Sequence, residues 1–219
     1  MHIESHLACG WILANLLPGS TRRERLAITL SAVISDADGL GYLVSADLYS
    51  RWHHTIGHNV FAAVAVGIVA IWLTRLHCWP IILLLTQLGY WSHIVGDYFF
   101  SGWGVPIFWP VSRYEILFHP VMRLDHPINM ALSYGALAIF AGSIWVLGRS
   151  PLEFLWPKFD GLLARLVAPR RCVCHFCGRR TGIICDRCHQ PVCVRHGQTN
   201  RKLQITCRAC EAAATAYLQ

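Results

Sequence analysis

Residues that can bind a metal ion recur at four places in the N-terminal half of the chain. His93 and Asp97 are four residues apart, a spacing that places both side chains on one face of a helix. His54 and His58 share this spacing, and His53 adjoins them. Imidazole and carboxylate ligands together suit Zn, Mn or Fe better than Ca or Mg. The candidate ligands of this site are His6, Asp36, Asp38, His53, His58, His93 and Asp97.

Two of these candidates, Asp36 and Asp38, lie inside the apolar segment 26–46. A carboxylate at membrane depth costs about 2.5–3.5 kcal/mol, so the pair must face water, form ion pairs or bind metal. Gly39 and Gly41 follow at once, and the stretch DADGLG therefore predicts a local break whose carboxylates converge on one ion. The alternative is a helix that ends at Ser35 and leaves both carboxylates in solvent. An ion with an open coordination position activates water at neutral pH. We therefore expect catalytic roles for Asp38, His93 and Asp97.

A second group of metal-binding residues lies near the C-terminus and has a more specific spacing. Four pairs, each separated by two residues, can each supply half of a tetrahedral zinc site. The pairs are Cys174 and Cys177, Cys185 and Cys188, Cys193 and His196, and Cys207 and Cys210. They occupy only 37 residues, too few for a good hydrophobic core, so bound metal must supply much of the folding free energy. A disulfide framework is the less favoured alternative, because it needs an oxidising compartment.

The order of these pairs resembles cross-brace zinc modules of the RING, FYVE and B-box kind. That resemblance implies one zinc on the first and third pairs and another on the second and fourth. Sequential pairing is the alternative, and Cys172, His175 and His189 could substitute as ligands. Sites with four protein ligands are expected to be structural. The module then acts as a stable tail or as a docking surface for a protein, a lipid headgroup or nucleic acid.

The segments that carry the first site are apolar. Hydrophobic residues make up 54% of the chain and charged residues 14%, against about 25% charged in a soluble domain. Mean hydropathy is +0.40. Residues 128–148 contain no charged residue or histidine and are long enough to span a bilayer. The other apolar segments are 7–17, 26–46, 55–73 and 79–96. We predict an all-α membrane bundle of four to five apolar helices with a small, metal-stabilised zinc-binding domain.

Positive charge predicts the orientation, because Lys and Arg favour the cytoplasmic side. Arg22, Arg23 and Arg25 precede the second apolar segment, Arg75 follows the third, and Arg149 follows the last. We therefore expect a multi-pass protein of the inner, cytoplasmic membrane with its cysteine module in the cytoplasm and its His/Asp site near the opposite face. The expected domains are a membrane domain at 1–150, an interfacial helix or linker at 151–171 and a two-zinc module at 172–219. The net charge of +7 also fits nucleic-acid contact, which we rank lower than the membrane surface.

A series of motifs resembles the predicted membrane-bound metal-dependent hydrolases, a bacterial inner-membrane family with a LexA-regulated member. The motifs are HxxxG at 6–10, DxD at 36–38, HHTIGHN at 53–59, HxxxD at 93–97 and GVPIFWPVS at 104–112. The resemblance covers roughly residues 1–150 and implies hydrolysis at a metal centre held by the ligands named above. The family's histidine motif is closer to H-R-x-x-T-H-S. In this chain His54, Gly57 and Asn59 replace the Arg, Thr and Ser of that motif.

Together these features predict a membrane-bound hydrolase in which metal-activated water attacks a phosphoester or another ester. Arg51, Arg113 and Arg123 on the site's face favour a phosphoryl substrate. The expected cofactors are Zn or Mn in the membrane domain and two structural Zn ions in the module. Membrane lipid is an expected partner, and the sequence does not decide between a small-molecule and a lipid substrate. The alternatives are a non-enzymatic adaptor that recruits a cytoplasmic protein through its zinc module, and a metal-ion or proton transporter.

Overall fold

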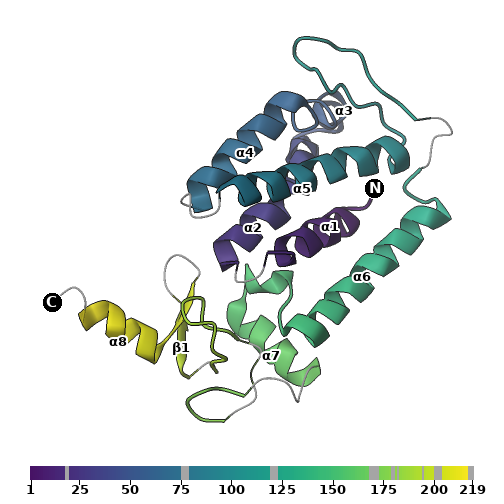
Figure 1. The fold of residues 1–219 in the computed structure, drawn as a ribbon. Helices are drawn as coiled ribbons and strands as arrows, with labels where there is room; N and C mark the ends of the chain where they lie inside the picture. Colours follow the sequence, from purple (N-terminus) through teal and green to yellow (C-terminus); the bar gives the residue numbers. More distant parts are fainter. Residues whose placement is uncertain are drawn as a thin grey trace. The chain divides into compact units, whose positions relative to one another are not determined.

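The computed structural model of the chain is mostly helical (Figure 1). It describes residues 1–17, 20–74, 79–118, 123–167, 173–178, 181, 183–193, 195–199 and 204–216. Arg75, Cys172 and the end of the expected linker at 168–171 lie outside the described residues. The chain forms two compact units, one of Met1–Pro18 with Glu24–Leu137 and one of Gly19–Arg23 with Ala138–Gln219. The division at Leu137 differs from the domain boundary expected at residue 150.

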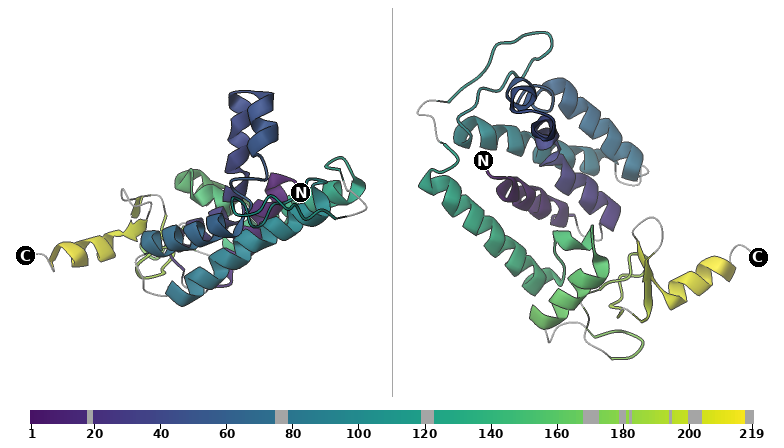
Figure 2. Two further views of the ribbon diagram at one scale, coloured as in Figure 1. Left: turned by 90° about the horizontal axis from the view of Figure 1, so that it is seen from above. Right: turned by 180° about the vertical axis from the view of Figure 1, so that it is seen from behind.

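The first unit is built from short helices around one long one. The long helix, α5 (Trp79–Phe100), packs against both α4 (Val60–Thr74) and α1 (Ile3–Asn15). The expected segment at 26–46 is broken into α2 (Arg22–Ser31) and the 3-10 helix η1 (Ile34–Leu43). Figure 2 shows η1 and α3 (Ala46–Trp52) side by side, projecting from the layer of α4 and α5.

Small residues allow the helices of this unit to approach closely. A Cβ on Gly10 would lie 2.7 Å from the Thr29 carbonyl oxygen, and one on Gly89 would lie 2.5 Å from Ser31 Oγ. These two glycines bring α1 and α5 against α2, which is the packing mode that membrane helices favour. The buried core beside this crossing consists of Ala14, Ala27, Ile28, Ala70, Ile82 and Leu85.

Among the described helices, α6 (Pro127–Leu147) is the one that by itself is long and apolar enough to cross a membrane, and only 17% of its apolar window is buried. The α2–η1 pair qualifies as a second span only if its 65° bend is part of one crossing. The expected four to five apolar helices are therefore not all realised as spans. α1 has 13 residues and α4 has 15, whereas about 20 are needed to cross the hydrocarbon core; α5 has 22 residues but is not apolar enough to qualify.

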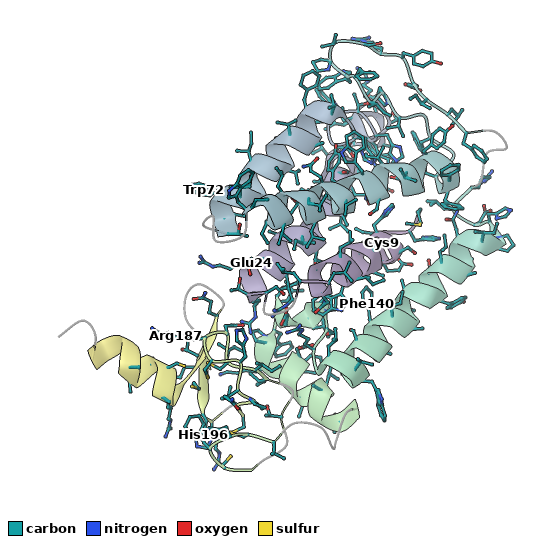
Figure 3. All side chains as sticks on the ribbon, viewed as in Figure 1. Cys9, Glu24, Trp72, Phe140, Arg187 and His196 are labelled. Atoms are coloured by element: carbon teal, nitrogen blue, oxygen red, sulfur yellow. The ribbon has the colours of Figure 1, made fainter. Side chains whose placement is uncertain are left out.

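The second unit contains the cysteine module. It comprises η2 (Pro151–Glu153), α7 (Pro157–Val167), an antiparallel hairpin of β1 (Gly197–Thr199) and β2 (Ile205–Cys207), and α8 (Arg208–Ala216). The buried residues of its core are Ile183, Cys185, Val192, Ile205 and Cys207. Gly161 of α7 lies directly against Ile183, so α7 and the module pack together. Figure 3 labels Arg187 and His196 in the module, where Arg187 Nη1 donates to the Cys210 carbonyl at 2.8 Å.

Candidate metal centres

Four of the predicted ligands converge in the first unit. Asp36 of η1, His58 of the loop before α4, and His93 and Asp97 of α5 each offer a ligand atom, and these atoms lie within 4.8 Å of one another. The side chains of His58 and His93 are fully buried and that of Asp97 is nearly so, whereas the Asp36 side chain is 20% exposed. The cluster is therefore buried at three of its four residues and reaches solvent at Asp36.

The distances within this cluster match the size of a transition-metal site. His58 Nε2 and His93 Nε2 are 3.1 Å apart, and they lie 3.3 and 3.1 Å from Asp97 Oδ2. Asp36 Oδ1 lies 3.5 Å from His93 Nε2 and 3.9 Å from His58 Nε2. A tetrahedral metal with bonds of about 2.0–2.1 Å has ligand–ligand edges of about 3.3 Å. Two imidazole nitrogens and two carboxylate oxygens at these distances fit zinc or manganese.

Hydrogen bonds on the far side of each imidazole fix which nitrogen faces the cluster. His93 Nδ1 donates to the Ala32 carbonyl at 2.8 Å, since a carbonyl oxygen only accepts. His58 Nδ1 donates to Asp38 Oδ2 at 3.0 Å. In the neutral rings both Nε2 atoms then carry lone pairs, and these converge with two carboxylate oxygens. Four converging lone pairs repel one another unless a cation lies among them, which is the arrangement found around bound metals.

Asp38 contacts the cluster only through histidine. Its Oδ1 accepts from His53 Nδ1 at 3.0 Å, and its Oδ2 accepts from His58 Nδ1 and from the Gly57 backbone N–H at 3.1 Å. Successive residues of a 3-10 helix are turned by about 120°, so Asp36 and Asp38, which are two residues apart, point in different directions. Asp36 lies at the Nε2 edge of the His58 ring and Asp38 at its Nδ1 edge. Asp38 and His53, which the sequence predicts as ligands, are placed here as supports of His58.

The loop at 53–59 is held by the residues at which the chain departs from the family motif. Asn59 Oδ1 accepts from the N–H groups of Phe61 and Ala62 at 3.0 and 2.9 Å, so Asn59 caps α4. Its Nδ2 donates to the carbonyls of Thr55 and Ile56. A Cβ on Gly57 would collide with the Ser35 carbonyl oxygen, so only glycine lets the loop pack on η1. These departures therefore support the position of His58.

Two further histidines surround Asp97. His6 Nε2 lies 3.1 Å from Asp97 Oδ1, and the α-amino group of Met1 lies 2.5 Å from the same oxygen. His54 Nε2 lies 3.5 Å from Asp97 Oδ2. His54 is 3% exposed and has a φ of 65°, a left-handed conformation that costs a non-glycine residue about 1–3 kcal/mol. His54 is absent from the ligands predicted from the sequence, although its imidazole lies only four residues before that of His58.

A family model described as YdjM inner membrane protein matches residues 1–167. The chain belongs to the YdjM inner membrane protein family. The match includes every residue of the His/Asp cluster and ends at the last residue of α7. No curated protein and no solved structure matches the chain. Membership supports the predicted inner-membrane location, and the cysteine module lies beyond the YdjM match.

The eight ligands of the module form two clusters that could hold metal ions. One contains Cys174, Cys177, Cys193 and His196, and the other contains Cys185, Cys188, Cys207 and Cys210. This grouping is the one that the cross-brace resemblance implies. The described cysteines form no disulfide. His175 and His189, which the sequence offered as substitutes, belong to neither of these two groups.

Distances within the module agree with zinc geometry. The Sγ atoms of Cys177 and Cys193 are 3.6 Å apart, and those of Cys188 and Cys207 are 3.7 Å apart. A tetrahedron with Zn–S bonds of about 2.3 Å has S–S edges of about 3.8 Å. His196 Nδ1 lies 3.5 Å from Cys174 Sγ, near the edge of about 3.6 Å expected between a nitrogen and a sulfur ligand. Both clusters therefore fit zinc.

The electrostatics of the thiols also suit a cation. Burial opposes ionisation of the Cys174 thiol, but backbone N–H groups, first that of Cys193, outweigh it and lower its pKa to about 6. Burial likewise opposes ionisation of Cys185, and backbone N–H groups lower its pKa to about 7. Burial and the adjacent thiols of Cys188 and Cys207 raise the pKa of Cys210. A metal ion would offset the repulsion between neighbouring thiolates and would ionise the remaining thiols.

Substituting Asp38 tests its position behind His58. Asp38→Asn is expected to weaken metal binding at the YdjM-family cluster by about 10–100-fold without abolishing it, because a support of a ligand is lost rather than a ligand. Affinity is measured by competition with a chromophoric chelator on full-length protein whose cysteine module is already loaded. Asp47→Asn is the control, since its side chain is 69% exposed on α3. Complete loss of the ion would show that Asp38 is itself a ligand, and unchanged affinity would remove its supporting role.

Proposed function

We propose that the chain is a metal-dependent hydrolase of the inner membrane. The observation that supports this is the buried cluster of Asp36, His58, His93 and Asp97, whose lone pairs converge and whose one exposed member faces solvent. A divalent transition metal bound there supplies the Lewis acidity that makes water nucleophilic at neutral pH and polarises an ester. The protein contributes the ligands, their orientation through Asp38 and the Ala32 carbonyl, and a largely closed surrounding.

A pocket that carries two arginines supports a phosphoester over a carboxylic ester. Arg51 and Arg113 line this pocket of about 550 Å³ on one side of α3, together with the acidic residues Asp47 and Glu115. The planar fork of an arginine side chain matches the oxygens of a phosphate group. Arg51 also pairs with Asp47 at 3.0 Å, which holds its guanidinium at the pocket wall. The pocket would therefore bind the anionic part of a substrate while the ester bond reaches Asp36.

The proposal is tested by hydrolysis assays on the full-length protein in lipid nanodiscs. The protein is supplied with Zn or Mn, and its metal content is measured before each assay. The substrates are phosphomonoesters, phosphodiesters and carboxylic esters, each in a water-soluble and a lipid form. Hydrolysis of a phosphoester that rises with metal occupancy is expected. If no ester is hydrolysed while the cluster holds metal, the chain is not a hydrolase of this class.

The cysteine module favours an adaptor role as a second candidate function. It lies outside the family match and presents two compact clusters that could hold structural zinc. In the proposed orientation, set by the arginine groups, this module is cytoplasmic and docks a protein partner. An adaptor needs the module and not the His/Asp cluster, so partner capture that survives loss of the cluster separates the two functions.

A further inference from the structure

An apolar groove adjoins the candidate hydrolase site. It has a volume of about 640 Å³ and lies among η1, α3, α4 and the loop that precedes α4. Its walls are almost entirely hydrocarbon. The apolar side chains that line it include Ile34, Leu48, Trp52, Ile56 and Val66. The groove is lined by residues of the η1–α3 pair, and Figure 2 shows this pair projecting from the helix layer. Its volume is in the range of small-molecule sites, about 300–1,000 Å³.

Part of the groove wall is formed by residues that hold the metal ligands. Asp38, Gly57 and Tyr90 line it, and Asp38 binds both His58 and the Gly57 N–H. The Tyr90 hydroxyl donates to the Gly57 carbonyl at 2.6 Å. Ala37, between the two aspartates, also faces the groove. A molecule lying in the groove would thus contact Asp38, the residue that supports His58 of the His/Asp cluster.

The groove and the polar pocket lie on the two sides of α3. Leu48 and Trp52 line both, so a hydrocarbon surface passes directly into one that carries the cations Arg51 and Arg113 and the anions Asp47 and Glu115. A ligand that fits both surfaces has a hydrocarbon chain and a charged head whose phosphate meets the arginines. Exposed apolar residues on α4, among them Phe61, Val64 and Ile68, extend the hydrocarbon surface outward. In an inner-membrane protein this surface meets acyl chains.

We propose that the substrate is a membrane lipid phosphoester whose hydrocarbon chain lies in this groove. This inference rests on the proposed hydrolase function and adds the substrate class. The chain in the groove positions the head beside Asp36 and His58, and Arg113 binds the phosphate. Each methylene buried in the groove should raise kcat/KM about two- to fourfold until the groove is full. A water-soluble phosphoester of the same head would be a poor substrate.

Lipid occupancy is measured without any reliance on hydrolysis. Full-length protein in vesicles of phosphatidylethanolamine and phosphatidylglycerol receives a phospholipid with a diazirine in its acyl chain. After irradiation, labelled residues are identified by mass spectrometry. Label on Trp52, Ile56 and Val66 is expected to exceed that on the exposed α6 residues Leu137 and Val146. Equal labelling of both sets, or cross-links from the groove to a second copy of the chain, would overturn the inference.

A variant in which a larger side chain fills the groove provides the matched test of lipid binding. Ala65 lines the groove, whereas Ala131 lies exposed on α6 and outside it. Ala65→Trp is expected to lower groove labelling at least about fivefold and to remove the dependence of kcat/KM on chain length, whereas Ala131→Trp changes neither. Unchanged metal content shows that each variant is folded, and Ala65→Phe serves if Ala65→Trp is not.

The two proposals fail in different ways. Labelling of the groove without hydrolysis of any ester counts against the hydrolase. Hydrolysis whose rate is independent of chain length, together with unlabelled groove residues, counts against the lipid substrate alone.

Discussion

His93→Ala is expected to remove one metal ion per chain and to abolish phosphoester hydrolysis. His93 Nε2 lies within 3.5 Å of three other candidate ligand atoms, from His58, Asp36 and Asp97. Without that nitrogen the remaining donors are two carboxylates and one imidazole, and their affinity for a transition metal falls. Loss of the ion removes several kcal/mol of transition-state stabilisation, so the rate should fall by about 10³-fold or more.

The measurement combines metal analysis with the hydrolysis assay on the full chain. Three described clusters could hold an ion, so the variant should retain the two ions of the cysteine module. His93→Gln keeps much of the side-chain volume but not the ligand geometry, and it should behave as His93→Ala does. Ser92→Ala is the control, because Ser92 is the next residue of α5 and bonds only to its own helix at the Gly89 carbonyl. A His93→Ala protein with full metal content and full activity would contradict the proposed function.

Removing metal from the cysteine module is expected to unfold it while α1 to α5 stay folded. The buried core of the module consists of five residues, two of which are cysteines. Structural zinc contributes about 10–16 kcal/mol in small zinc-binding peptides, more than this core can replace. The Val192 N–H to Ile183 carbonyl bond, now 2.8 Å long, should therefore open. Amide hydrogen exchange with and without a zinc chelator measures this directly.

Cysteine variants of the module distinguish the cross-brace pairing of the zinc ligands from the sequential pairing. Cys185→Ser and Cys210→Ser are expected to lose the same ion, because both residues belong to one cluster. Cys193→Ser should affect the other ion first. Cys9→Ser is the control, since Cys9 lies on α1 and outside the module. A chelated module that keeps slow exchange at Val192 would show that protein contacts alone hold it.

The sequence by itself determined the kinds of chemistry and much of their local placement. His93 and Asp97 share a helix face because α5 continues without a break from Trp79 to Phe100, and their contact at 3.1 Å follows from the i,i+4 spacing. The sequence also predicted a break in the segment 26–46, but the break lies at 32–33, between α2 and η1, whereas DADGLG is inside η1. The two-residue spacing of the cysteine pairs likewise identified the module, because residues so close in sequence can bind one metal ion together.

Only the tertiary structure decided which residues meet. The sequence predicted both Asp36 and Asp38 as ligands and gave the catalytic role to Asp38, whereas the structure places Asp36 in the cluster. Their separation depends on the 3-10 form of η1 and on where His58 lies between them. The position of His58 in turn depends on Gly57 packing against Ser35, a contact between residues distant in sequence. The apolar groove likewise forms from η1, α3 and α4 together. Local spacing carries no information on such contacts, because they are set by how separate elements pack rather than by the backbone of one element.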